Sequence, residues 1–168
     1  MTSIGSQDAL PRDTKEPVRF AGAELREYRH VCALFHTKEE EYRVLLPFIK
    51  DGIERGQKAF HIVDESRLEQ HVKVMEAAGI PAQSAREKGQ LEVRRWEDAY
   101  LRDGHFDQNR MLALIEEVLQ TGPAQGYPLT RLVANMEWAL EDRPGVNDLV
   151  EYENRLNFIL PKYDDPVI

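Results

Sequence analysis

The sequence lacks several features on which large protein classes depend. Cys32 is the only cysteine among 168 residues, which excludes an intrachain disulfide and a cysteine-rich zinc site. No run of about 18 apolar residues occurs, so no transmembrane helix is expected. The amino terminus also lacks the basic start and apolar middle of a signal peptide. Together with a lone cysteine in an apolar run, these absences predict a cytoplasmic protein.

Positive charge is also scarce. The formal net charge is −8, whereas phosphate recognition needs a clustered positive field. The nearest candidate for a basic patch is Lys88, Arg94 and Arg95, but Glu87 and Glu92 are interleaved with it. We interpret this stretch as a solvated surface of mixed charge and expect no direct binding to nucleic acid.

Glycine-rich phosphate motifs are missing as well. A P-loop needs G-x-x-x-x-G-K-[ST], in which glycines let backbone N–H groups reach the phosphates. Residues 36–41 read His-Thr-Lys-Glu-Glu-Glu at the equivalent junction, with no glycine and three carboxylates that would repel a triphosphate. The motifs G-x-G-x-x-G and G-x-S-x-G are absent too. We therefore expect a protein that is not an enzyme.

Four apolar runs alternate with helical patterns. Strands are predicted at 30–36, 59–63, 90–93 and 132–136, and each is followed by a helix or helical turn. Thr37 offers the N-cap of the first helix and Gly56 ends it, while Gly122 and Pro123 end the helix before the fourth strand. The last helix is predicted at about 146–160.

This order predicts the fold class. Strands that alternate with helices favour a parallel sheet with right-handed crossovers, and hence a three-layer α/β domain with helices on both faces. Residues 1–24 mix Gly, Ser, Pro, Asp and Lys without a period and are predicted to be a flexible tail. Residues 25–168 form a single predicted domain. Residues 166–168 predict the start of a further strand, and the chain is expected to be truncated there.

Several blocks of the sequence resemble the MEDS family, the methanogen/methylotroph DcmR sensory domain. The resemblance spans roughly residues 28–168 and is carried by His30–Phe35, Glu40–Ile49, Gly52–Val63, Met136–Leu140 and Leu149–Asn157. It implies a RecA/KaiC-like fold that here lacks the Walker A motif. It also implies a sensory module, because members of the family are often joined to histidine kinase, anti-sigma-factor or DNA-binding domains.

Polar and aromatic side chains follow several of the predicted strands. In parallel α/β sheets, ligands bind beyond the carboxyl ends of the strands. This rule places five residues near one edge as candidates for a small-molecule pocket: His36, Asp64, Trp96, Glu137 and Trp138. Two alternatives remain open, namely that both tryptophans are core or helix-packing residues and that the Glu137 carboxylate instead bonds neighbouring backbone groups.

Neither a metal site nor a reactive cysteine is predicted. His30, Cys32 and His36 share one face of the first predicted strand, but the two histidines lie roughly 20 Å apart and cannot bind one ion. Cys32 in the middle of a buried strand should be inert, because a reactive thiolate needs exposure. We expect neither metal nor cofactor.

Three functions remain. The first is a regulatory domain of signal transduction or transcription control that binds an unidentified small molecule. The second is an interaction module for a kinase, anti-sigma factor or other regulator, without a ligand of its own. The third, least favoured, is a degenerate nucleotide-binding enzyme that uses Glu137. No membrane partner is expected, and a homodimer through edge strands or helix packing remains open.

Overall fold

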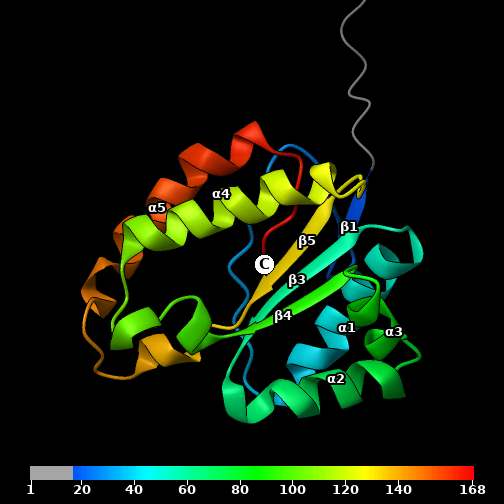
Figure 1. Cartoon of the computed structure of the whole chain (residues 1–168), viewed down its shortest axis with the longest axis horizontal. Coiled ribbons are helices and arrows are strands. Elements are labelled where there is room, and N and C mark those ends of the chain that lie inside the picture. The colour runs from blue at the N-terminus through cyan, green and yellow to red at the C-terminus, as the bar shows by residue number, and fades with distance from the viewer. Residues whose placement is uncertain (1–16) are drawn as a thin grey trace, which may run out of the picture.

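The computed structural model describes residues 17–168, and its centre is a parallel sheet (Figure 1). The sheet has the order β4-β3-β5, made of Lys58–Val63 (β3), Leu91–Arg95 (β4) and Thr130–Ala134 (β5). Helices α4 (Gln108–Ala124) and α5 (Leu149–Ile159) cover one face. Helices α1 (Lys38–Glu54), α2 (Leu68–Ala77) and α3 (Ala82–Glu87) cover the other face. The predicted parallel sheet with helices on both faces is confirmed.

The central strand forms where the sequence is apolar without alternation. All six residues of β3 are buried, and both neighbouring strands run parallel to it, with His61 opposite Val93 and Val133. A strand covered by helices on both faces has no solvent side, so its sequence shows no period of two.

The first helix begins as predicted. The Thr37 hydroxyl accepts a hydrogen bond from Glu40 N–H at 3.1 Å, and three glutamates occupy the first turn, where the helix dipole favours negative charge. Helix α4, in contrast, extends to Ala124, one residue past the predicted end at Gly122-Pro123. Pro123 lacks one N–H, but the Gln125 N–H still donates to Thr121 C=O at 3.0 Å, so the last turn closes.

The prediction of a first strand at 30–36 is wrong. Only His30 forms a bridge, to Val167, and the rest of this segment is extended without strand pairing. The reason lies at the other end of the chain, where Pro166–Ile168 run between β5 and Arg29–Val31. Leu132 N–H donates to Pro166 C=O, and Val31 N–H donates to Val167 C=O, each at 2.9 Å. The predicted strand at 166–168 therefore takes the place beside β5.

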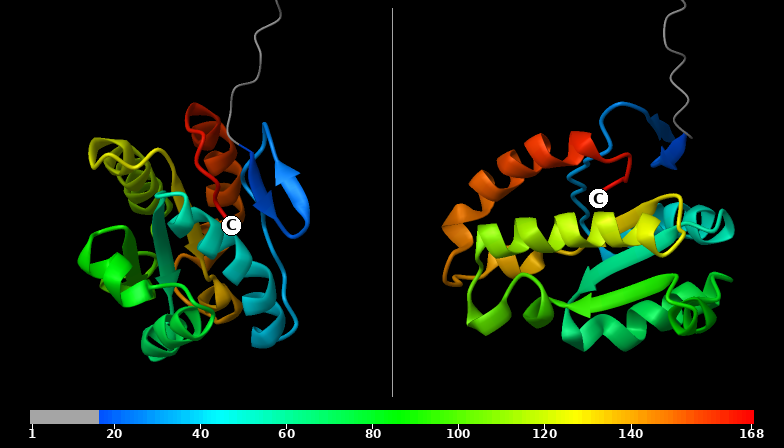
Figure 2. Two further views of the ribbon diagram at one scale, coloured as in Figure 1. Left: turned by 90° about the vertical axis from the view of Figure 1, so that its right-hand side faces the viewer. Right: turned by 45° about the horizontal axis from the view of Figure 1, so that its top comes forward.

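A hairpin replaces part of the predicted tail. Val18–Phe20 (β1) pairs antiparallel with Ala23–Leu25 (β2), so the prediction of flexibility is wrong for these residues. Val18 is fully buried, and the Phe20 ring meets that of Phe48 in α1 at 5.6 Å, so the hairpin is held by apolar contact with that helix. Figure 2 shows the hairpin beside the carboxyl end of the chain. Residues 1–16 of the predicted tail lie outside the described residues.

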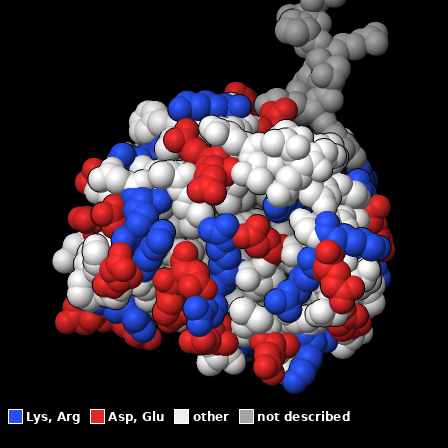
Figure 3. Space-filling model, in the orientation of Figure 1, with Lys and Arg blue, Asp and Glu red and all other residues white. Residues whose placement is uncertain are grey.

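Charges of both signs alternate over the surface seen in Figure 3. In the stretch considered above, Arg95 pairs with Glu65 and Asp98, and Arg94 pairs with Glu92. The proposed basic patch is thus a set of ion pairs, as the interpretation of mixed charge predicted. No helix within residues 17–168 is long and apolar enough to cross a membrane.

Candidate functional site

A cavity of about 480 Å³ lies at the carboxyl end of β5, between this strand and the segment that was predicted to be a strand. We call this segment, Val31–His36, the outer wall. Most of the cavity is apolar. Its apolar side chains come from both helical layers, from β5 and from the outer wall: Phe35, Leu45, Ile115, Val133, Tyr152 and Leu156. Its size and lining are typical of ligand sites in proteins.

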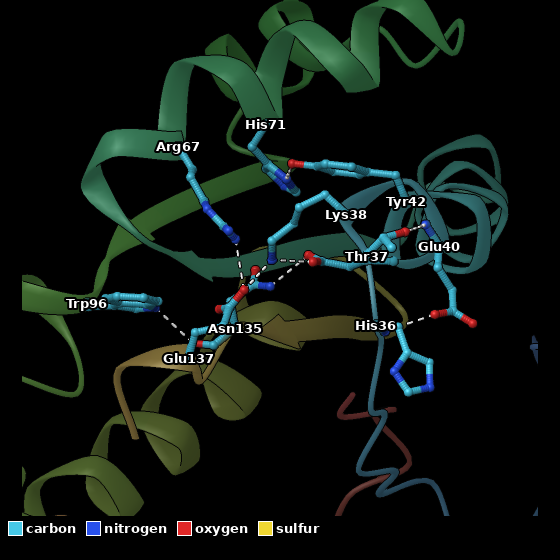
Figure 4. Close-up of polar contacts among 11 residues, drawn as sticks. His36, Thr37, Lys38, Glu40, Tyr42, Arg67, His71, Trp96, Asn135 and Glu137 are labelled. Atoms are coloured by element: carbon cyan, nitrogen blue, oxygen red, sulfur yellow. Dashed lines mark hydrogen bonds and ion pairs between the residues drawn. The ribbon is translucent and has the colours of Figure 1, made fainter. Parts of the chain in front are cut away.

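One end of the cavity is charged (Figure 4). Glu137, which follows β5, accepts a hydrogen bond from Arg67 Nη1 at 2.8 Å and from the Lys38 ammonium. Lys38 also contacts Glu41, whose other oxygen accepts from Asn135 Nδ2 at 2.7 Å. Two cations and two carboxylates thus meet at this end and neutralise one another.

The Glu137 carboxylate is only partly satisfied. Burial alone would raise its pKa, but the hydrogen bond from Lys38 and the charges of Lys38 and Arg67 lower it below its ordinary value. The carboxylate is therefore ionised at neutral pH. Its Oε2 atom is buried and has no hydrogen-bond partner among residues 17–168.

The structure brings two of the five candidate residues to the cavity. His36 and Glu137 line it, whereas Asp64, Trp96 and Trp138 do not. His36 is exposed, and its backbone N–H donates to Glu40 Oε2 at 2.9 Å. In Figure 4 its ring points away from the charged end. Whether any of the five binds a ligand stays a prediction.

The other three candidates have structural contacts. The Asp64 carboxylate accepts from Ser66 N–H at 2.7 Å and caps a short 3-10 helix, and hydrogen bonding to the side chain and backbone of Ser66 lowers the pKa of Asp64. Trp96 is buried and donates from Nε1 to Asn135 C=O at 2.8 Å. Trp138 is fully buried between Tyr100 and Phe106, with each ring centroid at 5.1 Å. The alternative that both tryptophans pack in the core matches their burial.

Sequence reasoning missed the partners of Glu137. Glu41 was interpreted only as a charge at a helix start, Asn135 was placed inside a strand, and neither Lys38 nor Arg67 was singled out as a partner. Besides the neighbouring backbone considered above, the Glu137 carboxylate has partners in side chains of two other elements, Lys38 and Arg67. The sequence did contain one signal for the contact between Lys38 and Glu137. Lys38 follows the capping Thr37, at the junction where a P-loop would bind phosphate.

A chain of buried polar groups lies behind this charged end. The Tyr42 hydroxyl lies 3.1 Å from His71 Nδ1, and His71 Nε2 lies 2.9 Å from His61 Nδ1. Burial lowers the pKa of His71 to about 4 and that of His61 well below its ordinary value, so both rings are neutral at pH 7. Each neutral imidazole has one donor and one acceptor, so Tyr42, His71 and His61 can form a continuous row of hydrogen bonds.

Cys32 differs from its prediction. It is exposed, not buried, because the outer wall is not covered by a neighbouring strand. The argument that burial makes this thiol inert is therefore wrong. Within residues 17–168, no group of three or more His, Cys, Asp or Glu side chains is arranged to hold a metal ion.

Comparisons with known proteins agree on one family. The family model described as "MEthanogen/methylotroph, DcmR Sensory domain" (MEDS) matches residues 29–166. The chain is 25% identical over 140 residues to the transcriptional repressor DcmR of Methylorubrum extorquens. The aligned region covers 82% of this chain and 49% of the repressor. The chain thus spans about half the length of this curated relative. No solved structure matches the chain.

Proposed function

The chain belongs to the MEDS family of sensory domains, and from this premise we propose that it is a cytoplasmic regulatory domain that binds a small molecule in the cavity beside β5. The observation that carries the proposal is the charged end of an otherwise apolar cavity. Lys38 and Arg67 are neutralised there by Glu41 and Glu137, and one buried oxygen of Glu137 has no donor within residues 17–168. An uncharged molecule with an apolar body and one N–H or O–H group would match both features.

The family match and the repressor relative support a sensory or regulatory role. We propose that binding controls transcription or signalling through another protein or domain, without catalysis by this domain. We also propose that the sheet is a RecA/KaiC-like core whose phosphate loop has been replaced. Its support is the junction at residues 36–38, where Lys38, the first residue of α1, contacts the carboxylates of Glu41 and Glu137.

A thermal-shift panel tests ligand binding. The panel contains ATP and GTP, each with magnesium, together with small apolar and one-carbon metabolites. A ligand at 100 times its dissociation constant stabilises the folded state by roughly 2.7 kcal/mol, which moves a domain of this size by several degrees. We expect a shift with an uncharged metabolite and none with the nucleotides.

Two matched variants locate the binding. Ala134→Phe places a large side chain in the cavity and should abolish the shift, whereas Ala23→Phe on the exposed hairpin should leave it unchanged. A panel without any shift would contradict the proposal. So would a shift that Ala134→Phe retains in full.

A further inference from the structure

A second cavity, of about 300 Å³, lies where the segment before the outer wall meets the end of α5. Residues 27–30 line one side, and the end of α5 with the segment up to Asp165 lines the other. Among residues 17–168, His30 alone lines both this cavity and the one beside β5, and residues 166–168 do not border it. We call it the second cavity. Its volume is at the lower end for ligand sites, so it suits a small molecule.

A buried carboxylate borders the second cavity. Asp165 is 7% exposed, and its Oδ1 atom accepts a hydrogen bond from Thr130 N–H. Among the described residues, no side chain donates a hydrogen bond to this carboxylate. Burial raises the pKa of Asp165 to about 6, and the charge of Arg29 offsets this rise only in part. The carboxylate is thus mostly ionised at pH 7 without a full counter-charge.

The lining of the second cavity has more negative than positive charge. Within the described part of the chain, its carboxylates are those of Glu27 and Asp165 and its one guanidinium is that of Arg29. Arg29 Nη1 donates to Asp164 C=O at 2.6 Å, and the charge of the Asp164 carboxylate raises the pKa of Asp165 further. This balance favours a cationic ligand over an anionic one.

His30 adds little positive charge to this balance, because a carboxylate outside the second cavity pairs with it. Its Nε2 lies 3.3 Å from Glu153 Oε2, and its Nδ1 lies 3.0 Å from Asn157 Oδ1. The hydrogen bond with Glu153 raises the pKa of His30, so a protonated imidazole is accompanied by that carboxylate. His30 thus forms a partition between the two cavities, and Glu153 lines the one beside β5.

Aromatic and apolar side chains complete the lining. Tyr28 is 78% exposed and borders the second cavity on one side, and Tyr163 borders it on the other. The Tyr163 hydroxyl accepts a hydrogen bond from Gln120 Nε2 at 3.1 Å, which helps to position this ring. Aromatic faces attract organic cations, and Leu160 and Pro161 can cover an alkyl group. An ammonium ion with a short alkyl chain therefore matches both the charge and the apolar lining.

We propose that the second cavity binds a small organic ammonium ion, which donates an N–H group to the Asp165 carboxylate and packs its alkyl part against Tyr28 and Tyr163. An alcohol of the same shape would fill the space but leave the carboxylate uncompensated, and the anion of a carboxylic acid would be repelled. This site goes beyond the proposed function and does not depend on it, so each can fail without the other.

The test uses n-butylammonium chloride as the probe and 1-butanol as its uncharged match. Each is titrated into the ¹⁵N-labelled chain at constant ionic strength and neutral pH, and amide shifts are followed by NMR. We expect saturable shifts at Tyr28, His30 and Tyr163 with butylammonium. Binding of butanol should be weaker by about tenfold or more, because the alcohol lacks the charge that strengthens the hydrogen bond.

A lysine side chain of a partner protein carries the same ammonium chemistry, so N-acetyl-lysine amide is titrated as well. Weaker binding of this compound than of butylammonium supports a free small molecule as the ligand. Tighter binding would overturn that assignment and point to a lysine of a partner.

Matched variants test the site from the protein side. Asp165→Asn removes the charge but keeps an oxygen that can accept from Thr130 N–H, and Asp142→Asn makes the same change at an exposed position outside both cavities. We expect the first to weaken butylammonium binding by about tenfold or more and the second by less than about twofold. Tyr28→Ala should weaken it by about threefold and Tyr28→Phe should retain it, because the ring and not the hydroxyl attracts the cation. If Asp165→Asn does not fold, the two variants of the exposed Tyr28 still decide.

Failure of this inference differs from failure of the proposed function. The inference is wrong if butylammonium does not bind, if butanol binds as tightly, or if Asp165→Asn and Tyr28→Ala bind the probe as tightly as the parent chain. It is also wrong if Ala134→Phe abolishes the butylammonium shifts, since the probe would then occupy the cavity beside β5. A metabolite that shifts the melting temperature while butylammonium fails would leave the proposed function standing.

Discussion

Removing Lys38 tests the charged end of the cavity most sharply. The Glu41 side chain is 7% exposed and the Lys38 side chain 37%. Removing one partner of a fully buried ion pair costs about 3–5 kcal/mol, since the other charge remains buried. Here Asn135 still donates to Glu41, and water reaches the position of Lys38, so we expect Lys38→Met to lower the free energy of unfolding by about 2 kcal/mol.

The control is the double variant. Lys38→Met with Glu41→Gln removes the uncompensated charge, so the double variant should lie within about 1 kcal/mol of the parent chain. Urea unfolding followed by circular dichroism measures the three variants of the cycle, which are Lys38→Met, Glu41→Gln and the double variant. If the single losses simply add in the double variant, Lys38 and Glu41 are not coupled, and our description of this end is wrong.

Three further predictions concern the rest of the domain. In an Asp165→Asn variant, the free energy of unfolding should fall by about 3 kcal/mol or more from pH 7 to pH 4. The reason is that His71 has a folded-state pKa of about 4 and takes up a proton on unfolding. Chemical denaturation across this pH range measures the loss. The parent chain should lose less over the same range, because burial raises the pKa of Asp165 to about 6 and its protonation favours the folded state as the pH falls; equal losses would contradict this assignment. Gly52→Ala should destabilise the fold by about 1–3 kcal/mol, since the added Cβ would lie 2.6 Å from the buried Arg131 side chain, and an unchanged urea midpoint would refute that packing. Cys32 should react with a thiol reagent in the folded chain without denaturant, and a thiol that reacts only after unfolding would contradict its exposure.

Local signals made much of the fold predictable. The apolar run of β3 and the capping Thr37 of α1 depend on neighbouring residues alone, and both appear as expected. The outer wall misled the same reasoning, because its apolar residues look like a buried strand. Whether such a run pairs depends on a partner far away in the sequence, and residues 166–168 occupy the place beside β5.

The site was predictable only in part, for a similar reason. Glu137 could be placed at the cavity because it follows a strand, and the carboxyl ends of parallel strands share one edge. Asp64 follows a strand too, but its carboxylate accepts a hydrogen bond from Ser66 N–H instead of lining the cavity. The position after a strand does not determine which of the two occurs. Arg67 reaches Glu137 across 70 positions of sequence, and no pattern within either segment indicates that contact.

The most direct test of the central claim is to map the ligand on the domain. The metabolite that gives the largest thermal shift is titrated into the ¹⁵N-labelled chain, and the perturbed amides are assigned by NMR. The account predicts that they cluster along the outer wall, at the end of β5 and around Glu137, and that Ala134→Phe abolishes them. Perturbations centred instead on the hairpin or on α3, or their persistence in Ala134→Phe, would contradict it.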